Sequence, residues 1–176
     1  MTLALLLGAV LAQASLTPSA SPTPSPTPVV LYVVRPPDGW QTMPPPSADP
    51  GRVDLLSIAF GPTVDGFRTT FNVIRDLLND PSESIETRAK ESATYMKSHN
   101  AGAVTASHAA KVCDGNRDGW YLESTGTFGE RKLSLVQTLL LDSGYEYVAT
   151  YSRPAGTPVD ASAVHALDTL CPQPGE

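Results

Sequence analysis

Short apolar runs separated by turn residues fill most of the chain from residue 29 onward. The first three runs are rich in the β-branched and aromatic residues that favour strands. They cover residues 29–34, 53–60 and 71–78. Gly61 and Pro62 follow the second run, and we expect them to end that strand.

Four further apolar runs follow residue 102, at residues 103–113, 120–125, 132–141 and 145–152. The segments between them are rich in Gly, Asp, Asn and Ser, which are typical of turns. Such short connections cannot form the crossover that parallel neighbours require. The pattern therefore predicts a four-stranded antiparallel meander.

A helix is predicted over residues 81–98, between the two groups of strands. Asp80 is the expected N-cap, Pro81 suits the first helical position, and Glu83 is placed to return the capping hydrogen bond. Apolar residues recur every three or four positions on one face. They are Ile85, Ala89, Ala93 and Met96.

A second helix is predicted over residues 160–170, with Asp160 as its cap and its apolar face against the sheet. That face comprises Ala161, Val164, Leu167 and Leu170. The order of elements is then β-β-β-α-β-β-β-β-α. It predicts an α+β fold, an antiparallel sheet of about six to seven strands flanked by helices.

The first 28 residues differ in composition from the rest. Residues 3–12 are uncharged and apolar but too few to span a bilayer, and Ala12 and Ala14 are small enough for signal peptidase. We expect residues 1–14 to be a signal peptide and residues 15–28, rich in Pro, Ser and Thr, to be a disordered tether. A single domain over residues 29–172 and a short tail, 173–176, complete the chain.

Charge limits the partners. Eighteen acidic residues against 12 basic ones give a net charge of −6, and no basic cluster suits nucleic acid or anionic lipid. An unknown protein or another envelope component is the expected partner. We expect a monomer with no transmembrane segment once the signal peptide is removed.

The two cysteines, Cys113 and Cys171, lie 58 positions apart, at the end of a predicted strand and just after the last helix. Export would expose them to an oxidising compartment, so we expect a disulfide that ties the helix to the sheet. A redox or metal-binding pair is the alternative, but no Cys-x-x-Cys motif or adjacent ligand favours it.

Four short motifs accompany this order of elements: Gly39-Trp40, Phe71-Asn72-Val73-Ile74, Gly119-Trp120-Tyr121 and Tyr147-Val148-Ala149-Thr150-Tyr151. With these motifs, the order of elements resembles the PsbP-like superfamily, the fold of the photosystem II extrinsic subunit P and of a yeast nuclear Ran-binding protein. The motifs and elements together span about 130 residues, from Pro36 to Leu170. The chain is most similar to the exported bacterial branch, and the resemblance implies the same α+β fold.

One segment resembles half of a calcium loop, because Asp114, Asn116 and Asp118 place oxygen-bearing side chains at alternate positions. Position twelve of the loop would be Thr125 rather than Glu, and Arg117 adds a positive charge. A tight hairpin is the favoured interpretation. A weak cation site, and with it a calcium-stabilised structural domain, is the alternative.

Recognisable catalytic chemistry is missing from the sequence. His99, His108 and His165 show no metal-ligand spacing, and there is neither a Gly-x-Ser-x-Gly elbow nor a phosphate-binding turn. We therefore expect no cofactor and no catalytic residues. A small hydrolase-like enzyme is the alternative, if His108 or His165 lies in a cleft beside a desolvated carboxylate.

The aromatic residues allow two interpretations. One is a stacking face for a sugar or peptide, and the favoured one is a sheet face packed beneath a helix. The residues concerned are Trp40, Trp120, Tyr121, Tyr145, Tyr147 and Tyr151. The leading hypothesis for the whole chain is an exported, non-catalytic binding or accessory module of the bacterial envelope.

Overall fold

A computed structural model describes residues 34–43, 53–100 and 102–172. These residues form one antiparallel sheet of seven strands in the order β1-β2-β3-β7-β6-β5-β4, with two helices. The elements are β1 (Gln41–Met43), β2 (Val53–Val64), β3 (Phe67–Leu77), α1 (Ile85–His99), β4 (Ala103–Val112), β5 (Arg117–Phe128), β6 (Arg131–Asp142), β7 (Tyr145–Pro154) and α2 (Ala161–Asp168). The predicted α+β fold and order of elements are confirmed.

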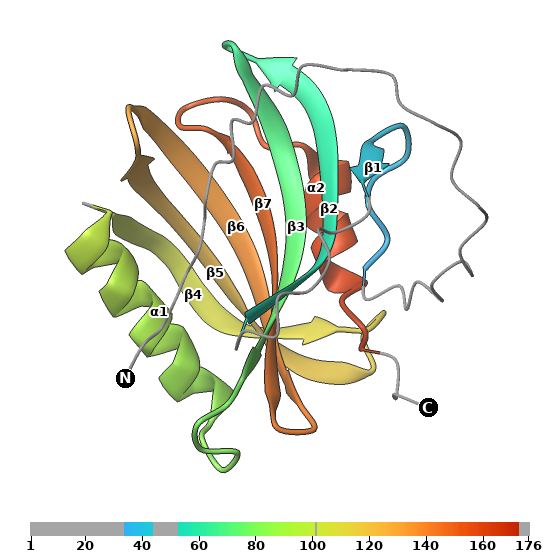
Figure 1. Cartoon of the computed structure of the whole chain (residues 1–176), viewed down its shortest axis with the longest axis vertical. Helices are drawn as coiled ribbons and strands as arrows, with labels where there is room; N and C mark the ends of the chain where they lie inside the picture. Colours follow the sequence, from blue (N-terminus) through green and yellow to red (C-terminus); the bar gives the residue numbers. More distant parts are fainter. Residues whose placement is uncertain (1–33, 44–52, 101, 173–176) are drawn as a thin grey trace, which may run out of the picture.

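The two helices lie on opposite faces of the curved sheet (Figure 1). α1 packs on β4, β5 and β6, whereas α2 packs mainly on β6 and β7. Successive residues of a strand point to opposite faces. Even-numbered residues of β7 therefore face the α1 side, and odd-numbered ones face the α2 side.

The α2 side holds the larger hydrophobic core. Phe71, Tyr151 and Leu167 are among its fully buried members, and Trp40 packs edge-on against Tyr151 at 6.0 Å between ring centroids. Asp160 caps α2 as predicted, accepting a hydrogen bond from the Ser162 amide at 2.9 Å. This core fixes α2 to the sheet.

A disulfide joins Cys113, just after β4, to Cys171, just after α2. The two Cα atoms lie 4.6 Å apart. The Asp114 amide also donates to the Asp168 carbonyl at 3.2 Å. The end of α2 is thus attached to the β4–β5 turn by a covalent link and a backbone hydrogen bond.

Two strand predictions need correction. β2 continues through Gly61 and Pro62 to Val64, because a register shift between Phe60 and Thr63 accommodates them without ending the strand. The chain turns instead at Asp65 and Gly66, both of which have positive φ. Of the run predicted as a first strand, residues 29–33 lie outside the described residues, and Val34 is buried beside α2 without being in a strand.

The start of α1 also differs from the prediction. Ser84 is the N-cap, and its hydroxyl accepts from the Thr87 amide at 3.2 Å. Asp80 instead accepts from the Ser82 amide and hydroxyl in the preceding turn. Both sites carry a short polar residue that bonds a backbone amide two or three positions on, so local pattern alone did not separate them.

The predicted apolar faces are largely correct. In α1, Ala89 and Met96 are buried, and Ile85 and Ala93 pack partly against the same face. In α2, Leu167 is buried and Leu170, just beyond its end, is too, whereas Ala161 is exposed. Ala161 is the first residue of the helix and lies on its solvent side.

Candidate functional site

The core on the α1 side of the sheet is divided in two. One cluster contains Ala89, Leu122, Leu139 and Val148, with Ile74, Ile85, Ala93 and Trp120 packed around it. The other contains Met96, Leu133 and Leu135, with Phe67 and Phe128. Polar side chains of β3, β5, β6 and β7 lie between the two clusters.

We call these side chains the polar belt. The strand register builds it in two adjacent rows across the sheet. In one row Gln137 of β6 pairs with Thr150 of β7, which pairs with Asn72 of β3. In the next row Ser124 and Ser152 flank Leu135, and Thr70 follows Ser152. The belt consists of Thr70, Asn72, Ser124, Gln137, Thr150 and Ser152.

Four members of the belt are buried, at 2% relative exposure or less: Ser124, Gln137, Thr150 and Ser152. The Gln137 side-chain amide donates to the Thr150 hydroxyl at 3.1 Å. The hydroxyls of Ser124 and Ser152 have no hydrogen-bond partner among the described residues. Such a buried, unpartnered polar group destabilises a fold and is uncommon in native proteins.

A cluster of charges lies at the N-terminal half of α1. Arg88 is buried and pairs with the buried Glu146 of β7 at 2.5 Å. Its guanidinium also lies 3.0 Å from Glu91 and 3.7 Å from Glu83. Asp76 of β3 is buried and pairs in register with Glu146. We call these five residues the ionic cluster.

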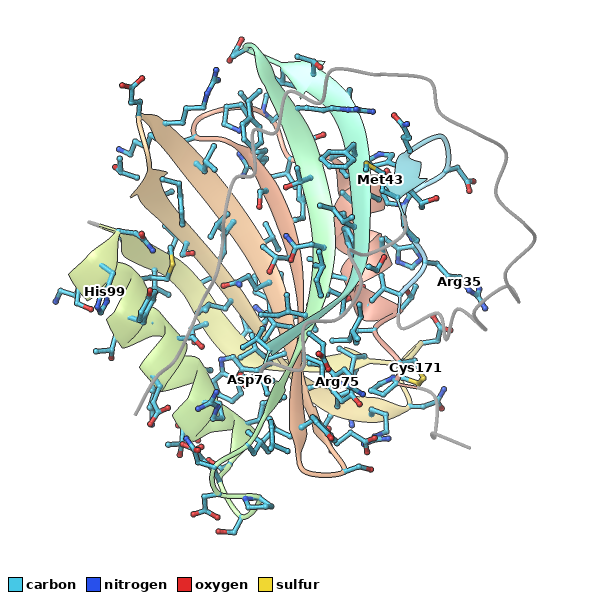
Figure 2. All side chains as sticks on the ribbon, in the orientation of Figure 1. Arg35, Met43, Arg75, Asp76, His99 and Cys171 are labelled. Carbon is cyan, nitrogen blue, oxygen red and sulfur yellow. A yellow bond between two sulfur atoms is a disulfide. The ribbon has the colours of Figure 1, made fainter. Side chains whose placement is uncertain are left out.

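Burial raises the pKa of Glu146 above its ordinary value, because desolvation disfavours the charged carboxylate. The hydrogen bond and charge of Arg88 act in the opposite direction, and the charges of Asp76 and Glu83 add to the increase. In Figure 2 Asp76 lies toward α1, while the neighbouring Arg75 lies toward Cys171. The ionic cluster is therefore confined to the α1 side of the sheet.

The residues of the predicted calcium half-loop lie in the tight turn between β4 and β5 and at the start of β5. Asp118 forms an ion pair with Lys111 at 2.6 Å, and this partner lowers the pKa of Asp118. The Asn116 side chain donates to the Cys113 carbonyl at 2.9 Å. In the described part of the chain, no three His, Cys, Asp or Glu side chains are grouped so that they could hold a metal ion.

The structure does not bring the three histidines together. His99 stacks on Tyr95 at the end of α1, and His108 stacks on Tyr121 across β4 and β5. His165 lies 3.8 Å from Asp168, and partial desolvation of that carboxyl raises its pKa. Both side chains are largely exposed, at 81% and 51%. This pair therefore lies on the open surface of α2 and not in a cleft.

The aromatic residues belong mostly to the core. Tyr147 and Tyr151 are buried on the α2 side, and Trp40, Tyr121 and Tyr145 pack against the same cluster. Trp120 lies on the other face, where its indole donates to Ser107 at 2.9 Å. This arrangement matches the favoured interpretation of a sheet face packed on a helix.

Sequence reasoning missed both the polar belt and the ionic cluster. A signal for the belt was present in β6, where Leu133 to Leu140 are all buried although Gln137 interrupts the apolar run. A glutamine within such a run indicates a polar interior. The ionic cluster had no comparable signal, because Arg88 and Glu146 are 58 positions apart.

Comparisons with known proteins give the fold alone. No family model and no curated protein matches the sequence. PA94 of Pseudomonas aeruginosa, a protein of unknown function, is similar in structure with a TM-score of 0.54 and 16% identity, covering 74% of this chain and 90% of that one. LpqN of Mycobacterium tuberculosis is involved in cell envelope biogenesis. It matches with a TM-score of 0.53 and 14% identity, and the match covers 77% of this chain and 78% of LpqN.

These similarities place the chain within a fold that is found in bacterial proteins. One of the two neighbours is involved in cell envelope biogenesis. Neither helix of the described ranges is long and apolar enough to cross a bilayer.

Proposed function

We propose that this chain is an exported, non-catalytic binding or accessory module of the bacterial cell envelope that engages its partner on the α1 side of the sheet. The polar belt is the observation that carries this proposal. Ser124 and Ser152 hold buried hydroxyls that no described residue satisfies. Because such groups cost stability, a partner that satisfied them would gain binding free energy.

On the α1 side the helix covers only part of the sheet. α1 packs on β4, β5 and β6, and no helix of the described part packs over β2 and β3 on this side. Ile58 and Phe60 of β2 are half-buried there and pair in register with Asn72 and Thr70, at the β3 end of the belt. A partner would therefore meet apolar side chains first and the hydroxyls of the belt beyond them.

An extracytoplasmic location is part of the proposal. Residues 1–14 have the composition of a signal peptide, and residues 15–28 that of a tether. The disulfide between Cys113 and Cys171 suits an oxidising compartment. The involvement of LpqN in envelope biogenesis is consistent with this address.

We also propose that residues 29–172 form a domain of the exported bacterial branch of the PsbP-like superfamily. The order of strands and helices supports this assignment, as do the short motifs around Trp40, Trp120 and Tyr151.

The binding surface can be tested by photo-crosslinking in the native envelope. A photo-reactive amino acid replaces Asn72, which is half-buried at the β3 end of the belt. The matched control replaces Lys90, which is exposed on the outer surface of α1. We expect a discrete adduct from position 72 and not from position 90. Adducts at both positions or at neither would contradict the proposed surface.

The location can be tested separately by mass spectrometry of the native protein. We expect an N-terminus at Ser15 and oxidised Cys113 and Cys171. An intact Met1 together with two free thiols would contradict export.

A further inference from the structure

We infer that the free edge of β4 binds an extended acidic segment of a partner protein, which adds to the sheet as a further strand beside α1. The inference goes beyond the proposed function, because it concerns the edge of the sheet and not the polar belt. On one side the sheet ends at β4. The N–H and C=O groups that β4 directs away from β5 therefore have no strand to pair with in the described part of the chain.

β4 lacks the features that usually protect an edge strand. Natural edges are short, carry Pro or charged side chains, or lie beneath another segment. β1, at the other edge, has only three residues, whereas β4 has ten, of which seven are exposed. β4 contains no Pro, and the only Lys, Arg, Asp or Glu in it is Lys111.

Most of this edge is regular enough to accept another strand. The register with β5 shifts between Val104 and Ala106, near the start of β4. From Ala106 to Val112 the register is unbroken over seven residues, which is an ordinary length for a strand. Backbone hydrogen bonds along these residues would supply affinity for any extended segment, and side-chain contacts would supply specificity.

An open groove lies at the start of β4, where α1 ends. It has a volume of about 400 Å³ and is lined by Ala93, Thr94 and Lys97 of α1 and by residues 102–104. Figure 1 shows α1 lying alongside β4. Side chains of a strand alternate between its two faces, so a strand that continues past Ala106 can place a side chain in this groove, against Ala93 and Val104.

The charge of this region favours an acidic partner. The chain has 18 acidic residues and a net charge of −6, yet residues 92–113 contain no Asp or Glu. They contain two lysines. Lys111 is paired with Asp118 at 2.6 Å, whereas Lys97 is exposed and has no acidic partner among the described residues. A carboxylate on the added strand would complement Lys97 at the rim of the groove.

A second copy of this chain suits the edge less well. Pairing of two copies edge to edge would place β4 against β4, and β4 has no acidic residue. The added strand would then bring no carboxylate to Lys97. The charge therefore favours a different chain as the source of the strand.

Selection from a library of random peptides displayed on phage tests the inference, with the full chain as the target. We expect enriched peptides to share an acidic residue next to alternating apolar ones. A synthetic copy of the most enriched peptide should slow hydrogen exchange, measured by NMR, at alternate amides between Ala106 and Val112. If no peptide is enriched, or if the slowed amides lie outside β4, the inference is overturned.

Three variants of exposed residues on α1 test the groove and its charge by fluorescence anisotropy with the same peptide. Lys97→Glu should weaken binding about fivefold or more, because attraction becomes repulsion, and Lys97→Arg should retain it. Lys90→Glu is the matched control: it makes the same reversal on the outer surface of α1 and should leave binding unchanged. Equal affinity for Lys97→Glu and the wild type would exclude the proposed role of Lys97.

Sedimentation of the free chain distinguishes the remaining occupant. If the chain alone dimerises and protects the same amides of β4, a second copy fills the edge and the inference fails. The adduct expected at position 72 is an independent result, because β7, β6 and β5 lie between β3 and β4. The proposed function can therefore stand if the β4 edge binds no peptide, and it can fail while the edge still binds one.

Discussion

The Nη2 atom of Arg88 on α1 lies 2.5 Å from the Oε2 atom of Glu146 on β7, and both side chains are at least nine-tenths buried. This ion pair joins α1 to β7, in addition to the apolar contacts of α1 with β4, β5 and β6. A buried pair contributes little net stability compared with apolar residues, but removal of one partner leaves a buried charge uncompensated.

Arg88→Ala should therefore lower the free energy of unfolding by about 3–5 kcal/mol, measured by urea denaturation. The double variant Arg88→Met/Glu146→Leu should recover most of that loss. Lys90→Ala is the control, because it breaks the exposed ion pair with Glu86. It should lower the free energy of unfolding by less than about 0.5 kcal/mol. A loss below about 1 kcal/mol for Arg88→Ala would mean that the pair does not hold α1.

Glu146 should give stability an unusual dependence on pH. Because its pKa is raised in the folded state, the folded protein takes up a proton at a higher pH than the unfolded chain does. The contribution of Glu146 to stability is therefore fully present below its unfolded pKa and is lost as pH rises through its folded pKa.

The comparison of wild type with Glu146→Gln isolates this contribution. As pH falls from neutrality toward the ordinary carboxyl range, the stability of the wild type should increase relative to that of the variant. Melting temperatures recorded across that range provide the measurement. A constant difference between the two proteins would show that Glu146 has no raised pKa.

The N-cap of α1 provides a direct comparison of two residues. Ser84→Ala should lower the free energy of unfolding by about 1 kcal/mol, because the Thr87 amide loses its acceptor. Asp80→Ala should cost less, since Asp80 stabilises only the preceding turn. Equal losses in thermal denaturation would place the start of the helix closer to Asp80.

The belt hydroxyls should behave differently from one another. Ser152→Ala should raise the free energy of unfolding by about 1 kcal/mol, because it removes a buried polar group that lacks a partner. Thr150→Val should lower it by a similar amount, because Gln137 then loses its acceptor. Chemical denaturation of both variants checks this, and a destabilised Ser152→Ala would indicate that its hydroxyl is already satisfied.

Removal of the disulfide with Cys113→Ala/Cys171→Ala should cost about 4 kcal/mol, because the bond closes a loop of 58 residues. A reducing agent should lower the melting temperature of the wild type toward that of the double variant. The double variant itself should not respond to it. A reductant effect of equal size in both proteins would exclude this disulfide as the cause.

Much of the fold could be predicted because its signals are local. The meander from β4 to β7 follows from apolar runs separated by turn residues, and Asp160 could be recognised as a cap. Predictions failed where two local signals compete. Gly61 and Pro62 are typical breakers, yet pairing of β2 with β3 on either side carries the strand through them. Asp80 and Ser84 are both plausible caps, and only the position of α1 against the sheet selects Ser84.

By itself, the sequence determined the class of fold, the order of its elements, and an acidic composition that argues against nucleic acid and anionic lipid as partners. Only the tertiary structure decided which residues form the candidate site. The polar belt draws Asn72, Ser124, Gln137 and Ser152 from four strands, and the ionic cluster joins α1 to β3 and β7. The physical reason is that secondary structure depends on neighbours along the chain, whereas burial and hydrogen-bond satisfaction depend on strand register and on packing between distant segments.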